Sequence, residues 1–95
     1  MDEELFWRQT ENGVTTVGLT DRAFDLFGQL WSIIPISDRK RNFLMNDPII
    51  TIEGSESLGA LSIPFNIKRI NFNGAALDRP DEMSSSTPLL VGEAA

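Results

Sequence analysis

The sequence contains no cysteine and no histidine. The absence of both residue types excludes a thiol nucleophile, an imidazole general base and the usual Cys/His zinc sites. It also excludes disulfide bonds, which fits a reducing compartment, and we take the cytoplasm as the expected location. Most familiar catalytic arrangements are therefore closed to this chain, and we expect that it is not an enzyme.

Basic residues are scarce, and long apolar runs are missing. Eight Lys and Arg stand against fourteen Asp and Glu, so the formal net charge is -6. Such a chain is poorly suited to nucleic acid, because affinity for a phosphate backbone depends on Lys and Arg displacing counterions. No segment approaches the roughly 20 apolar residues that span a bilayer, and the start Met1-Asp2-Glu3-Glu4 is acidic where a signal peptide is basic. We expect neither nucleic acid nor a membrane as a partner.

Short apolar or β-branched runs alternate with turn residues along the whole chain. This rhythm is typical of a compact, mainly β fold, and 95 residues suffice for one small domain with one core. The expected strands cover residues 5–9, 14–19, 30–35, 48–53, 58–63, 65–72 and 89–91. Asn12-Gly13 predicts a hairpin between the first two strands, since both residues tolerate positive φ. The apolar alternation of 65–72 slips once around Lys68-Arg69, which predicts a β-bulge or a sharp bend there.

One segment, 21–27, reads as a short helix instead of a strand. Thr20 is a suitable N-cap, and Gly28 can take the left-handed C-cap conformation. Seven residues are too few for independent stability, so Phe24 and Phe27 must hold the helix on the core.

The run Thr16 to Gly28, TVGLTDRAFDLFG, resembles the signature of the glycine cleavage system H protein, a lipoyl-carrying subunit. Further similarity to that family extends over residues 5–88. The resemblance implies the barrel-sandwich hybrid fold of lipoyl and biotinyl carriers, with the modified lysine at the tip of a hairpin. The family's C-terminal helices and its Gly-Trp-Leu strand are missing. We therefore interpret residues 1–95 as one H-protein-like domain, truncated at its C-terminus relative to the family.

Glu56 occupies the position of the family's lipoyl-accepting lysine. It lies four residues after Ile52 and eight before Pro64, the same spacing as the acceptor lysine has in the family. Lipoylation needs an amine that forms a stable amide, which a carboxylate cannot do, and the exchange reverses the local charge at neutral pH. We expect no lipoyl group, and no other cofactor or metal.

Gly54 and Gly59 bracket the tip and predict a tight, exposed turn. The candidate interaction residues there are Glu53, Ser55, Glu56 and Ser57. A glutamate on an exposed turn is most often a solvated charge, and a recognition tip is the alternative.

A second candidate surface lies in the long loop after the third strand. Arg39, Lys40 and Arg41 form a positive cluster that suits an acidic partner or a phosphate, although charge runs are usually just solvated. Leu44 belongs to an apolar triplet that either covers the core or forms a contact patch. Lys40 is also the best remaining lysine for an acyl arm, since Lys68 falls inside a predicted strand.

Three functional hypotheses follow. The leading one is a non-catalytic interaction or regulatory module that lost its arm and binds a protein, such as a glycine cleavage enzyme or a lipoyl-attaching enzyme. The second is an acyl or lipoyl carrier that uses Lys40. The third is an enzyme with Glu53 and Glu56 as paired carboxylates, but exposed carboxylates lack the burial that tunes a catalytic pKa. An incomplete sheet edge near 89–91 would also favour a homo-oligomer.

Overall fold

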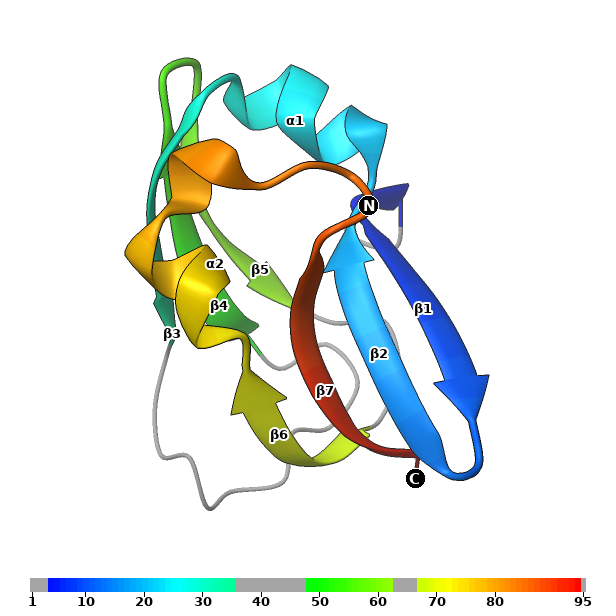
Figure 1. Cartoon of the computed structure of the whole chain (residues 1–95). Coiled ribbons are helices and arrows are strands. Elements are labelled where there is room, and N and C mark those ends of the chain that lie inside the picture. The colour runs from blue at the N-terminus through cyan, green and yellow to red at the C-terminus, as the bar shows by residue number, and fades with distance from the viewer. Residues whose placement is uncertain (1–3, 36–47, 63–66, 95) are drawn as a thin grey trace.

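Two antiparallel sheets make up the computed structural model, which describes residues 4–35, 48–62 and 67–94 (Figure 1). Sheet A has the strand order β1-β2-β7-β6, and sheet B has the order β3-β4-β5. The strands are β1 (Phe6–Glu11), β2 (Val14–Leu19), β3 (Leu30–Pro35), β4 (Pro48–Gly54), β5 (Leu58–Ser62), β6 (Ile67–Phe72) and β7 (Pro88–Ala94). The prediction of a mainly β fold is confirmed, although over the described residues the two sheets stay separate and do not close into a barrel.

The core fills the space between the two sheets. Each strand contributes at least one buried side chain to it, and simple alternation breaks in β4 and β7, where the neighbours Ile49-Ile50 and Leu89-Leu90 are buried together. Its largest fully buried members are Val17, Leu19, Phe27, Leu30, Ile49, Ile50, Ile52, Ile67, Leu89 and Leu90.

The β1–β2 hairpin turns through Asn12 and Gly13, with φ of 52° and 79°. Glu11 pairs with Val14 across this two-residue loop. Positive φ at both loop residues is the type I′ geometry, whose twist matches that of the flanking strands. The hairpin predicted from Asn-Gly is confirmed.

The irregularity predicted around Lys68-Arg69 is also confirmed. The pairing of β6 with β7 shifts register between Lys68 and Asn71, and Arg69 has a φ of 52°. A non-glycine residue with positive φ inside a strand bends the backbone, which explains the slip in apolar alternation.

Helix α1 (Asp21–Phe27) has the predicted bounds, but its ends differ from the prediction. Thr20 has the extended backbone of an N-cap, yet its hydroxyl donates to the Glu4 carbonyl (2.6 Å) and caps nothing. Gly28 has φ 73° and ψ -145°, which is not the left-handed helical conformation but a region that essentially only glycine occupies. The side chain of Thr20 thus binds the segment just before β1, and Gly28 redirects the chain into β3.

A second helix, α2 (Gly74–Asp78), lies where the sequence analysis placed none, and a 3₁₀ turn, η2 (Pro80–Glu82), follows it. The Asn73 side chain makes two hydrogen bonds at the start of α2. Its Oδ1 accepts from the Ala75 backbone N–H (3.2 Å), and its Nδ2 donates to the Pro88 carbonyl (2.8 Å). The N-cap therefore also ties α2 to the start of β7.

The last strand corrects one expectation. β7 spans Pro88–Ala94, longer than the predicted 89–91, and lies between β2 and β6 inside sheet A. Residues 89–91 are thus not at an edge of the sheet formed by the described strands. The edge strands are β1 and β6 in sheet A, and β3 and β5 in sheet B.

Trp7 packs flat over Gly18 on the neighbouring strand and donates its indole N–H to the Ser85 carbonyl (2.6 Å). A Cβ at position 18 would run into the indole ring. We expect Gly18→Ala to lower the free energy of unfolding by roughly 1 to 3 kcal/mol, because the ring must shift and lose its hydrogen bond. Urea denaturation followed by tryptophan fluorescence measures this. Trp7→Phe is the comparison, since it keeps an aromatic ring on β1 but removes the indole atoms over Gly18 together with the donor, and a G18A variant as stable as the parent would contradict the packing.

Candidate functional site

The candidate site is the tip of the β4–β5 hairpin. The Gly54 backbone N–H donates to the Ser57 carbonyl (2.9 Å) and closes a turn whose two tip residues are Ser55 and Glu56. Both tip residues are exposed, as the sequence predicted, and neither has the positive φ of the usual two-residue hairpin turns. The conformational preferences of the turn residues therefore do not explain this tip, and contacts with another part of the fold must hold it in place.

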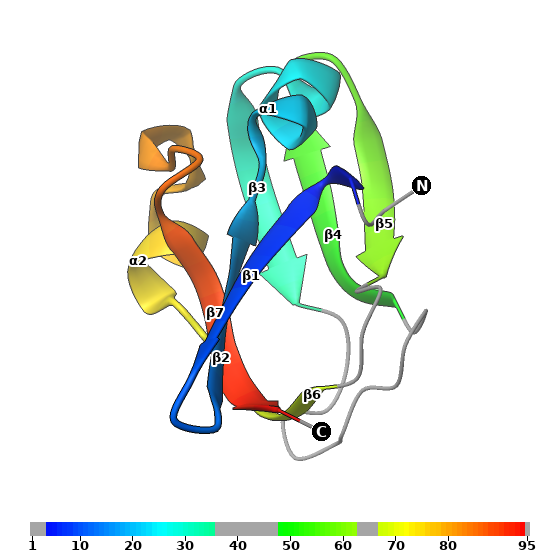
Figure 2. The same cartoon turned by 90° about the vertical axis from the view of Figure 1, so that its right-hand side faces the viewer.

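The connection between α1 and β3 supplies that support. The Ser55 N–H donates to the Gln29 carbonyl (2.9 Å), and the Gln29 N–H donates to Ser55 Oγ (3.0 Å). The Glu56 N–H donates to the Phe27 carbonyl (2.9 Å). Phe27 ends α1, so its carbonyl is one of those that a helix leaves without an internal partner. The helix end and the hairpin tip satisfy each other's backbone groups, and Figures 1 and 2 show them together at one end of the molecule.

Two glycines allow this close contact. An ideal Cβ at Gly54 would collide with the Phe27 carbonyl, and one at Gly28 would collide with the side chains of Ser55 and Glu56. Gly54 itself is buried. The backbone of the tip is thus fixed on α1, while the Glu56 side chain remains exposed.

Exposed apolar side chains lie on the outer face of sheet B next to the tip. Leu58 is 68% exposed, and Trp31 and Ile34 are each 58% exposed. Glu53 pairs with Leu58 across β4 and β5 and is exposed on this face. We call Trp31, Ile34, Glu53, Glu56 and Leu58 the tip surface.

The two carboxylates of the tip surface have no counter-ion within the ranges that the structure describes. Among the described residues, neither Glu53 nor Glu56 takes part in an ion pair or a side-chain hydrogen bond. Two unpaired negative charges beside large exposed apolar groups can attract a positively charged group that has apolar neighbours. Exposure on this scale gives neither carboxylate the desolvated setting of a general acid or base.

Of the predicted site residues, the structure brings Glu53, Ser55, Glu56 and Ser57 together at the tip. Trp31 and Ile34 were missed. Trp31 is the extra residue at a register shift between Leu30 and Ser32 in β3, so simple alternation does not reveal which way it faces. The predicted loop residues Arg39, Lys40, Arg41 and Leu44 lie outside the described residues.

A lipoyl group does not fit the tip as the chain presents it. The exposed group there is the Glu56 carboxylate, which cannot form a stable amide with lipoic acid. Lys68 is exposed on β6, and Figure 1 shows this strand near the opposite end of the molecule from the β4–β5 hairpin tip. No group of three or more His, Cys, Asp or Glu side chains suited to a metal ion occurs within the described ranges.

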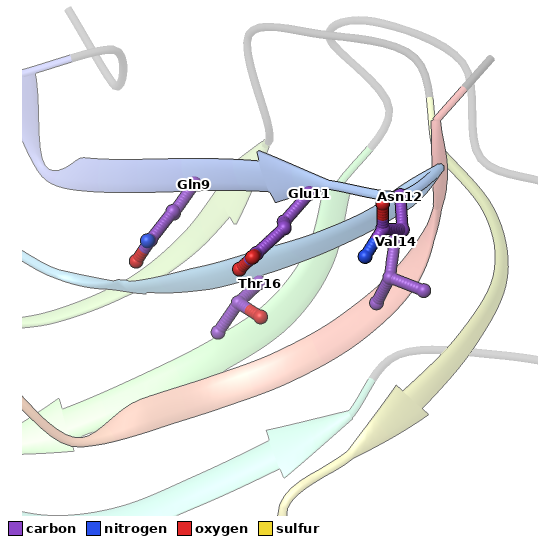
Figure 3. A pocket seen from close by; sticks show the side chains of 5 residues that line it. All are labelled: Gln9, Glu11, Asn12, Val14 and Thr16. Atoms are coloured by element: carbon purple, nitrogen blue, oxygen red, sulfur yellow. The ribbon is translucent and has the colours of Figure 1, made fainter.

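Two hollows elsewhere offer no comparable chemistry. One, of 290 Å³, lies on the β1–β2 hairpin and is lined by Gln9, Glu11, Asn12, Val14 and Thr16 (Figure 3). The other, of 210 Å³, lies beside α2 and η2, where Arg79 is already paired with Glu82 (3.3 Å). Neither gathers several unpaired charged groups, so neither carries a functional assignment. No helix in the described parts of the chain is long and apolar enough to cross a membrane.

Comparison with known proteins places the fold. No protein-family model matches the sequence. The crystal structure of a glycine cleavage system H protein from Mycobacterium marinum matches this structure with a TM-score of 0.79. The match covers 97% of this chain and 80% of that chain at 18% sequence identity. This likeness confirms the H-protein-like sandwich fold that the sequence resemblance implied, and at this identity it shows the fold alone.

Proposed function

We propose that this chain is a non-catalytic, protein-binding domain of H-protein-like fold that carries no lipoyl group. A fixed hairpin tip that presents Glu56 beside exposed Trp31, Ile34 and Leu58 is the observation that supports the proposal most. The proposed partner is a glycine cleavage enzyme or a lipoyl-attaching enzyme, met in the cytoplasm. A domain that occupies such an enzyme without an arm would regulate it by competition.

The first experiment tests the missing arm. We expect the chain to keep its unmodified mass when it is isolated from its host, and when it is incubated with lipoic acid, ATP and a lipoyl-attaching enzyme. Glu56→Lys should gain one lipoyl group, because position 56 is exposed on a backbone that α1 holds. Glu56→Gln is the matched control and should stay unmodified. Intact-mass spectrometry with peptide mapping measures all three proteins.

The outcomes of that experiment separate the hypotheses. An adduct on Lys40 of the unaltered chain would support the carrier alternative and overturn the proposal. Glu56→Lys itself should fold normally. Helix α1 has no basic residue in its last turn, and a positive side chain near a helix C-terminus changes stability by only about 0.3 to 1 kcal/mol, in the favourable direction.

The second experiment tests the binding surface. Purified glycine cleavage enzymes and a lipoyl-attaching enzyme are titrated with the chain by calorimetry. We expect Leu58→Asp to weaken binding at least tenfold, about 1.4 kcal/mol, since it places a charge among the apolar contacts. Glu11→Gln, on the β1–β2 hairpin, is the control and should bind normally. Failure of every such enzyme to bind would contradict the proposal, and neutralising Arg39, Lys40 and Arg41 together tests a separate role for that loop.

A further inference from the structure

The four edge strands differ in how well they are protected against pairing with another strand. A free edge presents unpaired N–H and C=O groups, which proteins usually blunt with charges, prolines, bulges or covering elements. β1 carries charged Arg8 and Glu11 on its edge. β6 has the bulge at Arg69 and its neighbouring Lys68. β3 has the bulge at Trp31 and ends in a proline, and α2 lies along it in Figure 1.

β5 has none of these devices. Its five residues, LGALS, include no charge and no proline, and its pairing with β4 is regular from Leu58 to Leu61. Among the strands of the described residues it pairs with β4 alone. Leu58 and Ala60 are both exposed.

The hydrogen bonds of the hairpin show which groups this edge offers. Gly54 and Ser57 form a hydrogen-bonded pair, and such pairs alternate along an antiparallel ladder. Gly59 and Leu61 therefore direct their backbone groups toward β4. Leu58 and Ala60 direct theirs away from β4, toward the free edge.

We propose that the β5 edge pairs with the β5 edge of a second copy of this chain, joining the two copies of sheet B into one six-stranded sheet. An antiparallel pairing about a two-fold axis at Gly59 sets Leu58 opposite Ala60 of the other copy, and the reverse. Each of these two pairs exchanges two backbone hydrogen bonds. The outward-pointing N–H and C=O groups of Leu58 and Ala60 therefore all gain partners. A large side chain faces a small one on the outer face, and glycine faces glycine on the inner face.

Charge does not oppose this pairing strongly. β5 itself is uncharged, and Glu53 lies one strand further in. Three strand spacings, about 14 Å, separate it from its own copy, which exceeds the Debye length at physiological salt. The face of sheet B would be a worse contact between copies, because a two-fold axis there brings Glu53 and Glu56 toward their own equivalents. Pairing also ends at the dimer, since the new outer edges are the bulged β3 strands.

The joined sheet would carry two tip surfaces, pointing in opposite directions because the paired strands are antiparallel. A partner with two matching sites would then bind with an avidity that one copy does not have. The pairing itself does not depend on the proposed function, and it is measured on the chain alone.

Sedimentation equilibrium of the chain over a range of concentrations is the first test. We expect a dimer of about twice the 10.6 kDa chain mass, with a Kd on the order of 10 to 100 µM that falls as salt screens the net charge of -6. Ala60→Pro removes the N–H that points away from β4 and leaves the N–H groups that bond to β4. This variant should therefore sediment as a monomer. Ala60→Val keeps that N–H and should still dimerise. A parent chain that stays monomeric up to roughly 0.5 mM overturns the proposal.

Cysteine cross-linking tests the register without relying on a proline variant that folds. Because the chain has no cysteine, Leu58→Cys and Ala60→Cys each introduce a single thiol. Directly opposite hydrogen-bonded residues have Cα atoms about 5.5 Å apart, which suits a disulfide. We expect the mixture of both variants to form the mixed disulfide several-fold more than either variant alone forms its own. Cross-linking only between like cysteines, or none at all, overturns the pairing.

Discussion

Replacing Phe27 with alanine is expected to lower the free energy of unfolding by about 3 to 5 kcal/mol. The Phe27 side chain is 2% exposed and lies beneath the hairpin tip, with its ring 3.9 Å from the Cβ position of Gly59. Its removal leaves a cavity between α1 and sheet B. A loss of this size is a large share of the 5 to 15 kcal/mol that stabilises a typical protein. Urea denaturation monitored by circular dichroism measures it.

Phe24→Ala provides the comparison within the same helix. Phe24 packs against the core but is only partly buried, so its removal should cost clearly less than that of Phe27. Equal losses for both variants, or an unchanged melting temperature for Phe27→Ala, would contradict the position of α1 as the support of the tip.

Gly28→Ala is expected to cost roughly 2 to 6 kcal/mol and to release the tip from α1. Two penalties add: a backbone conformation that costs an L residue about 1 to 3 kcal/mol, and overpacking against the tip of about 1 to 3 kcal/mol. The added methyl group would meet Ser55 Oγ and the Glu56 side chain. Amide hydrogen exchange at Ser55 and Glu56 reports the release directly, because their N–H groups donate to the α1–β3 connection.

Gly74→Ala is the matched control for a glycine replacement. Nothing lies within 4 Å of its Cβ position, and it sits at the start of helix α2. Alanine there should leave stability unchanged or raise it by up to about 1 kcal/mol. If both glycine variants lost the same stability, the conformation of Gly28 would not be the cause.

Short sequence patterns predicted the parts of the fold that depend on residues adjacent in the chain. Asn12-Gly13 predicted the first hairpin, the slip at Lys68-Arg69 predicted the bulge, and the helix bounds at 21–27 are the observed ones. Helix α2 was missed because five residues are too short to display a 3.6-residue period. Asn73 caps this helix, and its second bond, to Pro88, exists only in the folded chain.

The candidate site, too, was predicted only where neighbouring residues determine the structure. Gly54 and Gly59 around a polar tip predicted the exposed turn at Ser55 and Glu56. The anchoring of that turn on Gln29 was not predictable, because the two segments are far apart in sequence and both glycines involved look like ordinary turn residues. The exposure of Trp31 was hidden for another reason: a bulge changes which face a side chain takes, and composition does not locate it.

The central position of β7 determines the order in which sheet A can form. Val17 pairs with Leu90, 73 positions later, so among the described strands β2 has only β1 beside it until residues 88–94 have been synthesised. An isolated two-stranded hairpin is marginally stable at best. Pairings this distant in sequence close slowly, typically within milliseconds to seconds, and during that interval the unpaired side of β2 is open to other chains. The growing chain is thus most exposed to aggregation just before the seven-residue strand β7 emerges.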